Sequence, residues 1–159
     1  MVHVAIFDIL LIGCCSYALW RGGAPERWAA GLEILAVLLT ALIQMQSRAH
    51  HYFDDFSPGI FLVDAGFLAA LCVIALTADR FWAIAAAGFQ VADIVVHLCK
   101  VLAPDILPLG YGVGISAWGY PKLVMFAIGA RRHRLRLERY GRDPSWSRPA
   151  SLRGALQAA

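Results

Sequence analysis

Four polar side chains lie at helical spacing inside an otherwise apolar stretch of the chain. Gln90, Asp93, His97 and Lys100 occupy positions i, i+3, i+7 and i+10, which an α-helix places within an arc of roughly 80°. A carboxylate, an imidazole and an ammonium on one helix face can exchange protons, bind a cation, or pair with groups on a neighbouring helix. The spacing therefore predicts a polar helix face with several possible chemistries.

The composition of the chain indicates that these groups lie in a membrane. Of 159 residues, 60% are hydrophobic and 16% are charged, whereas soluble domains average about 45–50% apolar and about 25% charged residues. A chain this short has too much surface for its volume to bury such an excess in a soluble core. Lipid-facing surface removes the difficulty, because the outside of the fold is then as apolar as its inside.

Five apolar runs of spanning length predict an all-α integral membrane bundle. Each run is long enough to cross a hydrocarbon core of about 30 Å at about 1.5 Å per residue. The last run is the least regular, because it contains five glycines, Pro121 and Lys122, so four spans remain the alternative. The expected bundle covers residues 1–130 and is followed by a basic tail at 131–159, with spans near 2–20, 28–46, 58–78, 81–103 and 109–130.

The distribution of basic residues predicts the orientation. A cytoplasmic C-terminus places Arg21, Arg27, Arg80 and eight tail arginines inside, eleven in all, and leaves Arg48 and Lys100 outside. This bias follows the positive-inside rule and puts the N-terminus of a five-span chain outside. The tail is expected to bind anionic lipid headgroups rather than nucleic acid. Its arginines are Arg131, Arg132, Arg134, Arg136, Arg139, Arg142, Arg148 and Arg153.

Depth along the predicted spans matches one acid with one base. Glu33 lies about 9 Å from the cytoplasmic face, and Lys122 lies about 10 Å from the same face. We therefore expect an ion pair between Glu33 and Lys122. Pro121 removes one backbone hydrogen bond and frees the carbonyl of Ala117, which predicts a bend in the last span.

A cluster of three acids is expected nearer the outer face. Asp8, Asp64 and Asp93 all lie roughly 20 Å from the cytoplasmic face, with His97 one turn further out. Like charges at one depth disfavour ionisation of one another, so protons, a bound cation, or basic side chains such as Lys100 must neutralise them. The simpler alternative is that these groups join helices through ordinary polar contacts.

A metal or haem site is a weaker hypothesis. His50, His51, Asp54 and Asp55 lie in the polar stretch after the second run. Together with His97, these histidines could ligate a divalent metal or a haem iron. Their spacing matches no closed zinc pattern, so a solvated loop is the simpler interpretation and any cofactor stays unknown.

One glycine-rich pattern resembles a known ion-binding motif only in part. The sequence Gly110-Tyr111-Gly112 resembles a potassium-channel filter over only three residues, and close helix packing through Gly110 and Gly114 is the preferred interpretation. The same glycines are a possible contact in a homo-oligomer or a larger membrane complex. The chain has no nucleophile–base arrangement, zinc-protease motif or phosphate loop, so an enzyme is not indicated.

The third and fourth runs resemble small uncharacterised inner-membrane proteins of alphaproteobacteria. The resemblance covers the segments Val63-Asp64-Ala65-Gly66-Phe67-Leu68 and Ala78-Asp79-Arg80-Phe81-Trp82, and includes His97. It implies a multi-pass protein of the bacterial inner membrane and no particular activity.

Three functions are consistent with the sequence. The first is a non-catalytic accessory or structural membrane protein. The second is a small proton- or cation-coupled transporter that uses Asp8, Asp64, Asp93 and His97. The third is a metal- or haem-binding redox subunit with His50, His51 and His97 as ligands.

Overall fold

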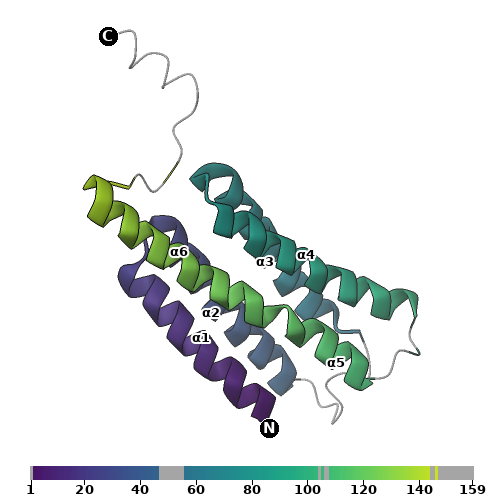
Figure 1. Cartoon of the computed structure of the whole chain (residues 1–159). Helices are drawn as coiled ribbons and strands as arrows, with labels where there is room; N and C mark the ends of the chain where they lie inside the picture. Colours follow the sequence, from purple (N-terminus) through teal and green to yellow (C-terminus); the bar gives the residue numbers. More distant parts are fainter. Residues whose placement is uncertain (1, 47–55, 104, 106–107, 144–145, 147–159) are drawn as a thin grey trace.

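The fold of the described residues is entirely helical. The computed structural model describes residues 2–46, 56–103, 105, 108–143 and 146, and within them it contains helices and no strand. The helices are α1 (Val2–Arg21), α2 (Ala24–Gln46), α3 (Pro58–Ala78), α4 (Phe81–Leu102), α5 (Pro108–Ala117) and α6 (Gly119–Tyr140). Figure 1 shows them as one elongated bundle.

Five segments are long and apolar enough to cross a membrane. They are α1, α2, α3, α4 and the segment Gly110–Tyr140, which combines most of α5 with α6. Their outward-facing side chains are apolar, with Ile9, Leu62 and Leu76 each at least 70% exposed. Such surfaces suit a hydrocarbon solvent. The structure therefore confirms the predicted all-α bundle with five candidate spans.

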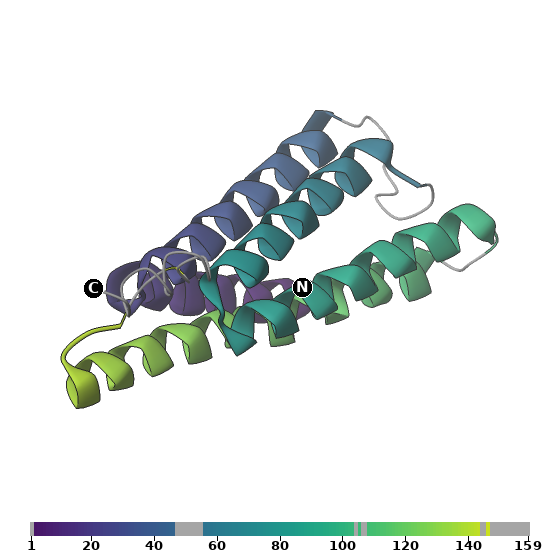
Figure 2. The same ribbon diagram turned by 90° about the horizontal axis from the view of Figure 1, so that it is seen from above.

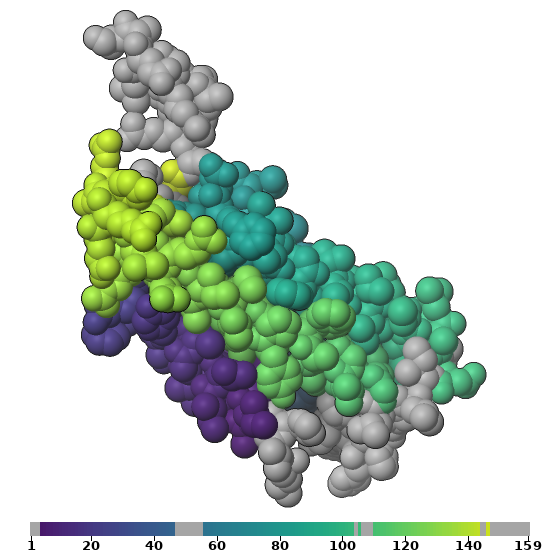
Figure 3. All heavy atoms as spheres, in the orientation of Figure 1, coloured from purple at the N-terminus to yellow at the C-terminus, as the bar shows by residue number. Residues whose placement is uncertain are grey.

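The five spanning segments form a closed ring. Contacts run from α1 to α2, α2 to α3, α3 to α4, α4 to α6 and α6 back to α1, while α5 packs against α4 and α6. In the view of Figure 2, α2 and α3 lie side by side, opposite the layer of α4, α5 and α6. Figure 3 shows α6 filling the space between α1 and α4 along the visible face. A ring of this kind encloses an interior that every span can line.

The last span is interrupted where Pro121 predicts a bend. The sequence predicts one helix near 109–130, but α5 ends at Ala117 and α6 begins at Gly119. Pro121 has no N–H to donate to the carbonyl of Ala117, and it is tolerated in the first turn of the new helix because N–H groups there lack helical acceptors. Because of this break, Lys122 lies in the first turn of α6.

The basic segment continues the last helix further than the sequence predicts. The predicted bundle ends at residue 130, whereas α6 extends to Tyr140. The residues between them are mostly arginine and leucine with one glutamate, which favour helix, and Arg134 pairs with Glu138 one turn later at 2.9 Å. The helix ends at Gly141, whose φ of 69° is the left-handed conformation that glycine adopts readily. Hydropathy alone therefore marked the end of the apolar run rather than the end of the helix.

Apolar side chains fill the half of the bundle nearer Tyr140. Leu71, Leu123, Phe126 and Trp82 are almost fully buried there. They pack against small residues, which let neighbouring helix backbones approach closely. The small residues of this core are Cys15, Ala18, Ala29, Ala30, Ala78, Ala83, Ala86 and Ala130.

Gly129→Ala is expected to destabilise the bundle by about 1–3 kcal/mol through overpacking. A Cβ at this position would lie 2.7 Å from Cδ1 of the Trp82 ring. That ring cannot move without breaking the hydrogen bond from its indole N–H to Glu26. Thermal unfolding of the purified protein in detergent measures the loss. Gly13→Ala is the matched control, because a Cβ there would meet nothing within 4 Å; equal melting temperatures for the two variants would contradict the packing argument.

Candidate functional site

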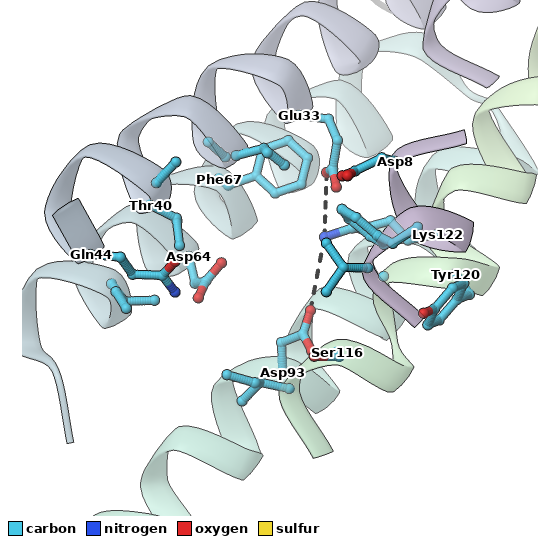
Figure 4. A pocket seen from close by; sticks show the side chains of 18 residues that line it. Asp8, Glu33, Thr40, Gln44, Asp64, Phe67, Asp93, Ser116, Tyr120 and Lys122 are labelled. Carbon is cyan, nitrogen blue, oxygen red and sulfur yellow. Dashed lines mark ion pairs between the residues drawn. The ribbon is translucent and has the colours of Figure 1, made fainter. Parts of the chain in front are cut away.

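The ammonium of Lys122 lies at the centre of the polar interior. Its Nζ donates a hydrogen bond to Oε1 of Gln90 at 2.7 Å and lies 3.3 Å from Oε2 of Glu33 and 3.8 Å from Oδ2 of Asp93. Figure 4 shows the side chains of Glu33, Asp93 and Lys122 meeting from α2, α4 and α6. The predicted Glu33–Lys122 ion pair is thus present. Both residues are at least 95% buried.

A chain of hydrogen bonds leads away from Lys122 toward α5. Gln90 links the two halves, because its amide N–H donates to Oδ1 of Asp64 at 3.2 Å. Oδ2 of Asp64 lies 3.0 Å from Nε2 of His97, and Nδ1 of His97 lies 2.7 Å from the hydroxyl of Tyr111. A neutral His97 protonated on Nε2 satisfies both of its contacts, since the Tyr111 hydroxyl then donates to Nδ1. Protons can redistribute among Asp64, His97 and Tyr111, whereas the Gln90 amide only joins them to Lys122 by hydrogen bonds.

Aromatic rings surround the imidazole at the far end of this chain. The rings of Phe56, Phe61 and Tyr111 each meet the His97 ring edge to face, with centroids 5.7–6.3 Å apart. Lys100 is 96% buried, and its Nζ lies 5.8 Å from the centre of the Tyr111 ring. The structure therefore groups His97 and Lys100 around the Tyr111 ring, whereas Asp93 lies beside Lys122.

A cavity of about 440 Å³ lies between these groups. It reaches from Glu33 and Lys122 to Val4, Gln44 and Ile60, near the helix ends that are predicted to face outward. Asp8 contributes to its wall from α1, so all four acids with a predicted depth face one space. Figure 4 shows the labelled lining, which comes from every spanning segment.

Acidic groups outnumber basic groups on the cavity wall. Of the described residues that line it, four carry a carboxylate and one, Lys122, carries an ammonium. The acids are Asp8, Glu33, Asp64 and Asp93. His97 contacts Asp64 from outside the lining, so even a protonated His97 leaves the site with two uncompensated charges when every acid is ionised. The interior therefore needs protons or a further cation.

Two carboxylate oxygens of this site have no hydrogen-bond partner among the described residues. They are Oδ1 of Asp93 and Oε2 of Glu33, and both atoms are buried. Oε2 of Glu33 still faces the Lys122 ammonium at ion-pair distance. Oδ1 of Asp93 has no such compensation. A buried acceptor without a donor costs free energy, and a ligand or proton in the cavity would remove that cost.

The structure offers little support for the metal and channel-filter patterns. No group of three or more His, Cys, Asp or Glu side chains in the described part of the chain is arranged to hold a metal ion, and His50 and His51 lie outside the described residues. Both ring nitrogens of His97 are engaged, by Asp64 and by Tyr111. Gly110–Gly114 is part of α5 rather than an extended filter, and a Cβ on Gly114 would lie 3.0 Å from Val96 of α4. Gly114 thus serves close packing within the chain.

A second buried network lies at the opposite end of the bundle, and the sequence patterns did not indicate it. The Trp82 indole donates to Oε1 of the fully buried Glu26 at 2.9 Å. Asp143 follows α6 and accepts hydrogen bonds from Arg80 at 2.9 Å and from Arg136 at 2.9 Å, with Nδ1 of His133 at 2.6 Å. Asp143 is therefore held against the start of α4.

Trp82 is buried, unlike two other tryptophans that lie near the ends of spanning helices. Aromatic rings at such positions commonly lie at the membrane interface. Trp20 and Trp28 are 72% and 62% exposed, but Trp82 is 2% exposed. Glu26 explains the difference, because a buried carboxylate needs a donor and the indole N–H supplies it.

Asp143→Asn is expected to lower stability by about 2 kcal/mol near neutral pH, because hydrogen bonds to charged groups contribute about 1.5–3 kcal/mol. Burial raises the pKa of Asp143, but hydrogen bonds from Arg80, His133 and Arg136 outweigh it, so the pKa lies below its ordinary value. An acid with a lowered folded-state pKa stabilises the fold above its unfolded-state pKa of about 3.9. That stability is lost as the pH falls through the lower folded-state value.

Melting temperatures of the wild type and Asp143→Asn, measured from neutral to strongly acidic pH, check this prediction. The gap between the two proteins should be full at neutral pH and should close below the ordinary aspartate range. A gap that widens on acidification would contradict the proposed role of the carboxylate.

Comparison with known proteins does not assign the chain to a group. No protein-family model, no curated protein and no solved structure matches it. The site must therefore be interpreted from its own geometry.

Proposed function

We propose that this chain is a carrier of the bacterial inner membrane that moves a small cation in exchange for protons. The observation that supports this best is the cavity of about 440 Å³, whose wall presents four carboxylates and one ammonium. A cation and protons would compete for the same acids, because either can neutralise them. Competition for one site is the simplest basis for exchange.

The unpaired acceptors favour a carrier over a purely structural role. Polar groups that only join helices are expected to satisfy one another, since unsatisfied groups in hydrocarbon are costly. Glu26 and Arg136 in the second network also have one unpaired buried atom each, but only the unpaired Oδ1 of Asp93 and Oε2 of Glu33 belong to residues of the cavity wall among these described atoms. A binding site must keep such acceptors available for its ligand. This requirement explains why the fold tolerates the free-energy cost of leaving them unpaired.

The arrangement of the two halves suits alternating access. The cavity lies in the half nearer Val4, Gln44 and Ile60, whereas Leu71, Leu123 and Phe126 close the half nearer Tyr140. Carriers bind near the middle of the bilayer and open to one side at a time. The interruption at Trp118, next to the cavity residue Gly119, is the natural hinge for such a change.

The proposed orientation follows the positive charge. The ends of the helices that carry Arg21, Arg27, Arg80 and the arginines of α6 face the cytoplasm in this scheme, where anionic lipids attract them. The cavity then lies in the outer half of the membrane. Neither a nucleic acid nor a catalytic partner is needed for this function.

Reconstitution into liposomes tests the proposal directly. Proteoliposomes that hold a proton gradient and a trapped pH-sensitive dye are challenged with sodium, potassium or small organic ammonium ions. We expect at least one of these cations to release protons faster than it does from protein-free liposomes. If none does so, the carrier function is wrong.

The two rival functions make different predictions in simple measurements. An accessory protein would show no cation-dependent proton movement, although substitutions of Asp64, Asp93 and His97 would still reduce its stability or partner binding. A metal- or haem-binding subunit, with ligands such as His50, His51 and His97, would give a visible absorption spectrum or a stoichiometric metal content after purification. A colourless, metal-free sample that still moves protons would favour the carrier.

A further inference from the structure

We infer that the cation is an organic amine with an apolar body, bound with its ammonium group beside Oδ1 of Asp93, which is unpaired among the described residues. This inference rests on the proposed carrier function and names the class of its substrate. Its physical basis is a site that combines acidic oxygens with an apolar, aromatic wall and a volume of about 440 Å³.

The size of the cavity favours an organic ligand over a bare metal ion. Sites for small organic molecules usually measure about 300–1,000 Å³, and this cavity falls in that range. A dehydrated metal ion needs several oxygen atoms converging at about 2.0–2.6 Å. The described residues contain no group of three or more acids, histidines or cysteines placed to hold an ion in that way.

The wall between the acids is mainly apolar, although Thr40, Gln44 and Ser116 also line the cavity. Phe7 and Tyr120 form an edge-to-face pair with ring centres 5.8 Å apart, and both line the cavity. Aliphatic side chains complete this surface and offer nothing to an inorganic ion, whereas they would remove the apolar part of an amine from water. They are Val4, Ala36, Val37, Ala41, Ile60 and Ile115.

Lys122 shows how the site holds an alkylammonium group. Its Nζ lies 4.9 Å from the centre of the Phe67 ring, within the range of a cation–π contact. The same atom donates to Gln90 and faces Glu33. A substrate amine carries the same head group, so acidic and aromatic groups of the kind that hold the lysine also suit a substrate bound beside it.

Asp93 provides the acceptor that the lysine leaves unused. Its Oδ2 lies 3.8 Å from Lys122 Nζ, beyond hydrogen-bond distance, and its Oδ1 has no partner in the described part of the chain. Asp93 is 95% buried and is part of the cavity wall. An ammonium beside it would donate to the unused oxygen, and a proton bound there would weaken amine binding.

The first test measures binding of three probes of similar shape to the full-length protein in detergent. Phenethylammonium is the cation, 2-phenylethanol is a neutral analogue and 3-phenylpropanoate is an anion. We expect phenethylammonium alone to raise the melting temperature with saturation, and calorimetry to show weaker binding as the pH falls. Equal binding of the neutral alcohol would overturn the inference, because the acids would then make no contribution.

Two pairs of variants locate the binding site. Asp93→Asn should weaken phenethylammonium binding about tenfold or more, the loss that corresponds to one charge-assisted contact. Asp79→Asn makes the same chemical change at an exposed position outside the cavity and should have no effect. Val37→Trp fills the cavity without altering its charge and should also block binding. Leu38→Trp places the same ring on the exposed face of α2, where Leu38 is 57% exposed, and should not block binding.

The transport assay separates failure of this inference from failure of the proposed function. Proton release driven by phenethylammonium but not by sodium or potassium supports an organic amine where its rate exceeds that of protein-free liposomes, which the neutral free base crosses unaided. Release driven only by sodium or potassium would overturn the substrate class and leave the carrier function standing. If Asp93→Asn fails to fold, Val37→Trp decides the outcome, and the reverse also holds. The two variants change different properties of one site, its charge and its volume.

Discussion

Asp93→Asn is expected to abolish cation-driven proton release from proteoliposomes, with rates falling at least about tenfold toward those of protein-free liposomes. The carboxylate lies on the cavity wall, and its Oδ1 has no hydrogen-bond partner among the described residues. Asparagine has nearly the same shape but can neither ionise nor take up a proton at neutral pH. The exchange therefore loses the group for which both ions compete.

The fold should survive this substitution, which makes the loss of transport informative. Lys122 keeps its ion pair with Glu33 at 3.3 Å and its hydrogen bond to Gln90. Neutralising Asp93 also removes a repulsive carboxylate from beside Glu33. The melting temperature should thus stay equal to or above that of the wild type. Full transport by Asp93→Asn, or identical defects in the exposed Asp79→Asn control, would remove Asp93 from the mechanism.

The sequence was sufficient to predict the parts of the fold that depend on solvent and on helix length. Hydropathy located all five spanning segments, because hydrocarbon demands about 20 apolar residues per crossing. A constant rise per residue then placed Glu33 and Lys122 at one depth, and the structure joins them. Such a count works only for groups near a well-marked boundary in a regular helix. Pro121 predicted the interruption of the last span for an equally local reason.

Contacts that depend on helix rotation and packing were beyond this kind of reasoning. Gln90 was placed on the polar face of α4, but its bridge between Lys122 and Asp64 requires the rotations of α3, α4 and α6 together. Tyr111 was considered as part of a filter-like motif, whereas packing of α5 on α4 turns its hydroxyl to His97. The sequence predicts the depth of a side chain along the bundle axis. Its position across the bundle depends on how the helices are rotated and packed in the ring.

The network at the opposite end depends on residues distant in the chain. Asp143 contacts Arg80, which precedes it by 63 positions, and Trp82 contacts Glu26 across 56 positions. Nothing local in a basic, polar segment indicates that one of its acids folds back on the bundle. Arg80 and Trp82 both stand at the start of α4, so this short segment joins the ends of α2, α4 and α6.

Lys122→Met is expected to be the most destabilising single substitution in the interior. Glu33 and Asp93 are 98% and 95% buried, and without the ammonium they must either stay charged and unpaired or take up protons. Removing one partner of a buried ion pair costs about 3–5 kcal/mol. Met preserves the length and apolar character of the lysine stem, so little of this loss comes from packing. Thermal unfolding in detergent at neutral pH measures it.

The double variant Glu33→Gln with Lys122→Met should recover much of the lost stability, because a buried pair replaced on both sides leaves fewer uncompensated charges. Arg134→Met at the exposed pair with Glu138 should cost less than about 0.5 kcal/mol, the usual value for such a pair in water. The contrast matters more than either value alone. If Lys122→Met costs no more than Arg134→Met, the interior acids are already neutral or hydrated in the resting protein, and the lysine is not their counterion. If Lys122→Met lowers the melting temperature strongly and the double variant restores it, the cost lies in the unpaired charge of Glu33. A bound ammonium would relieve that charge in the same way.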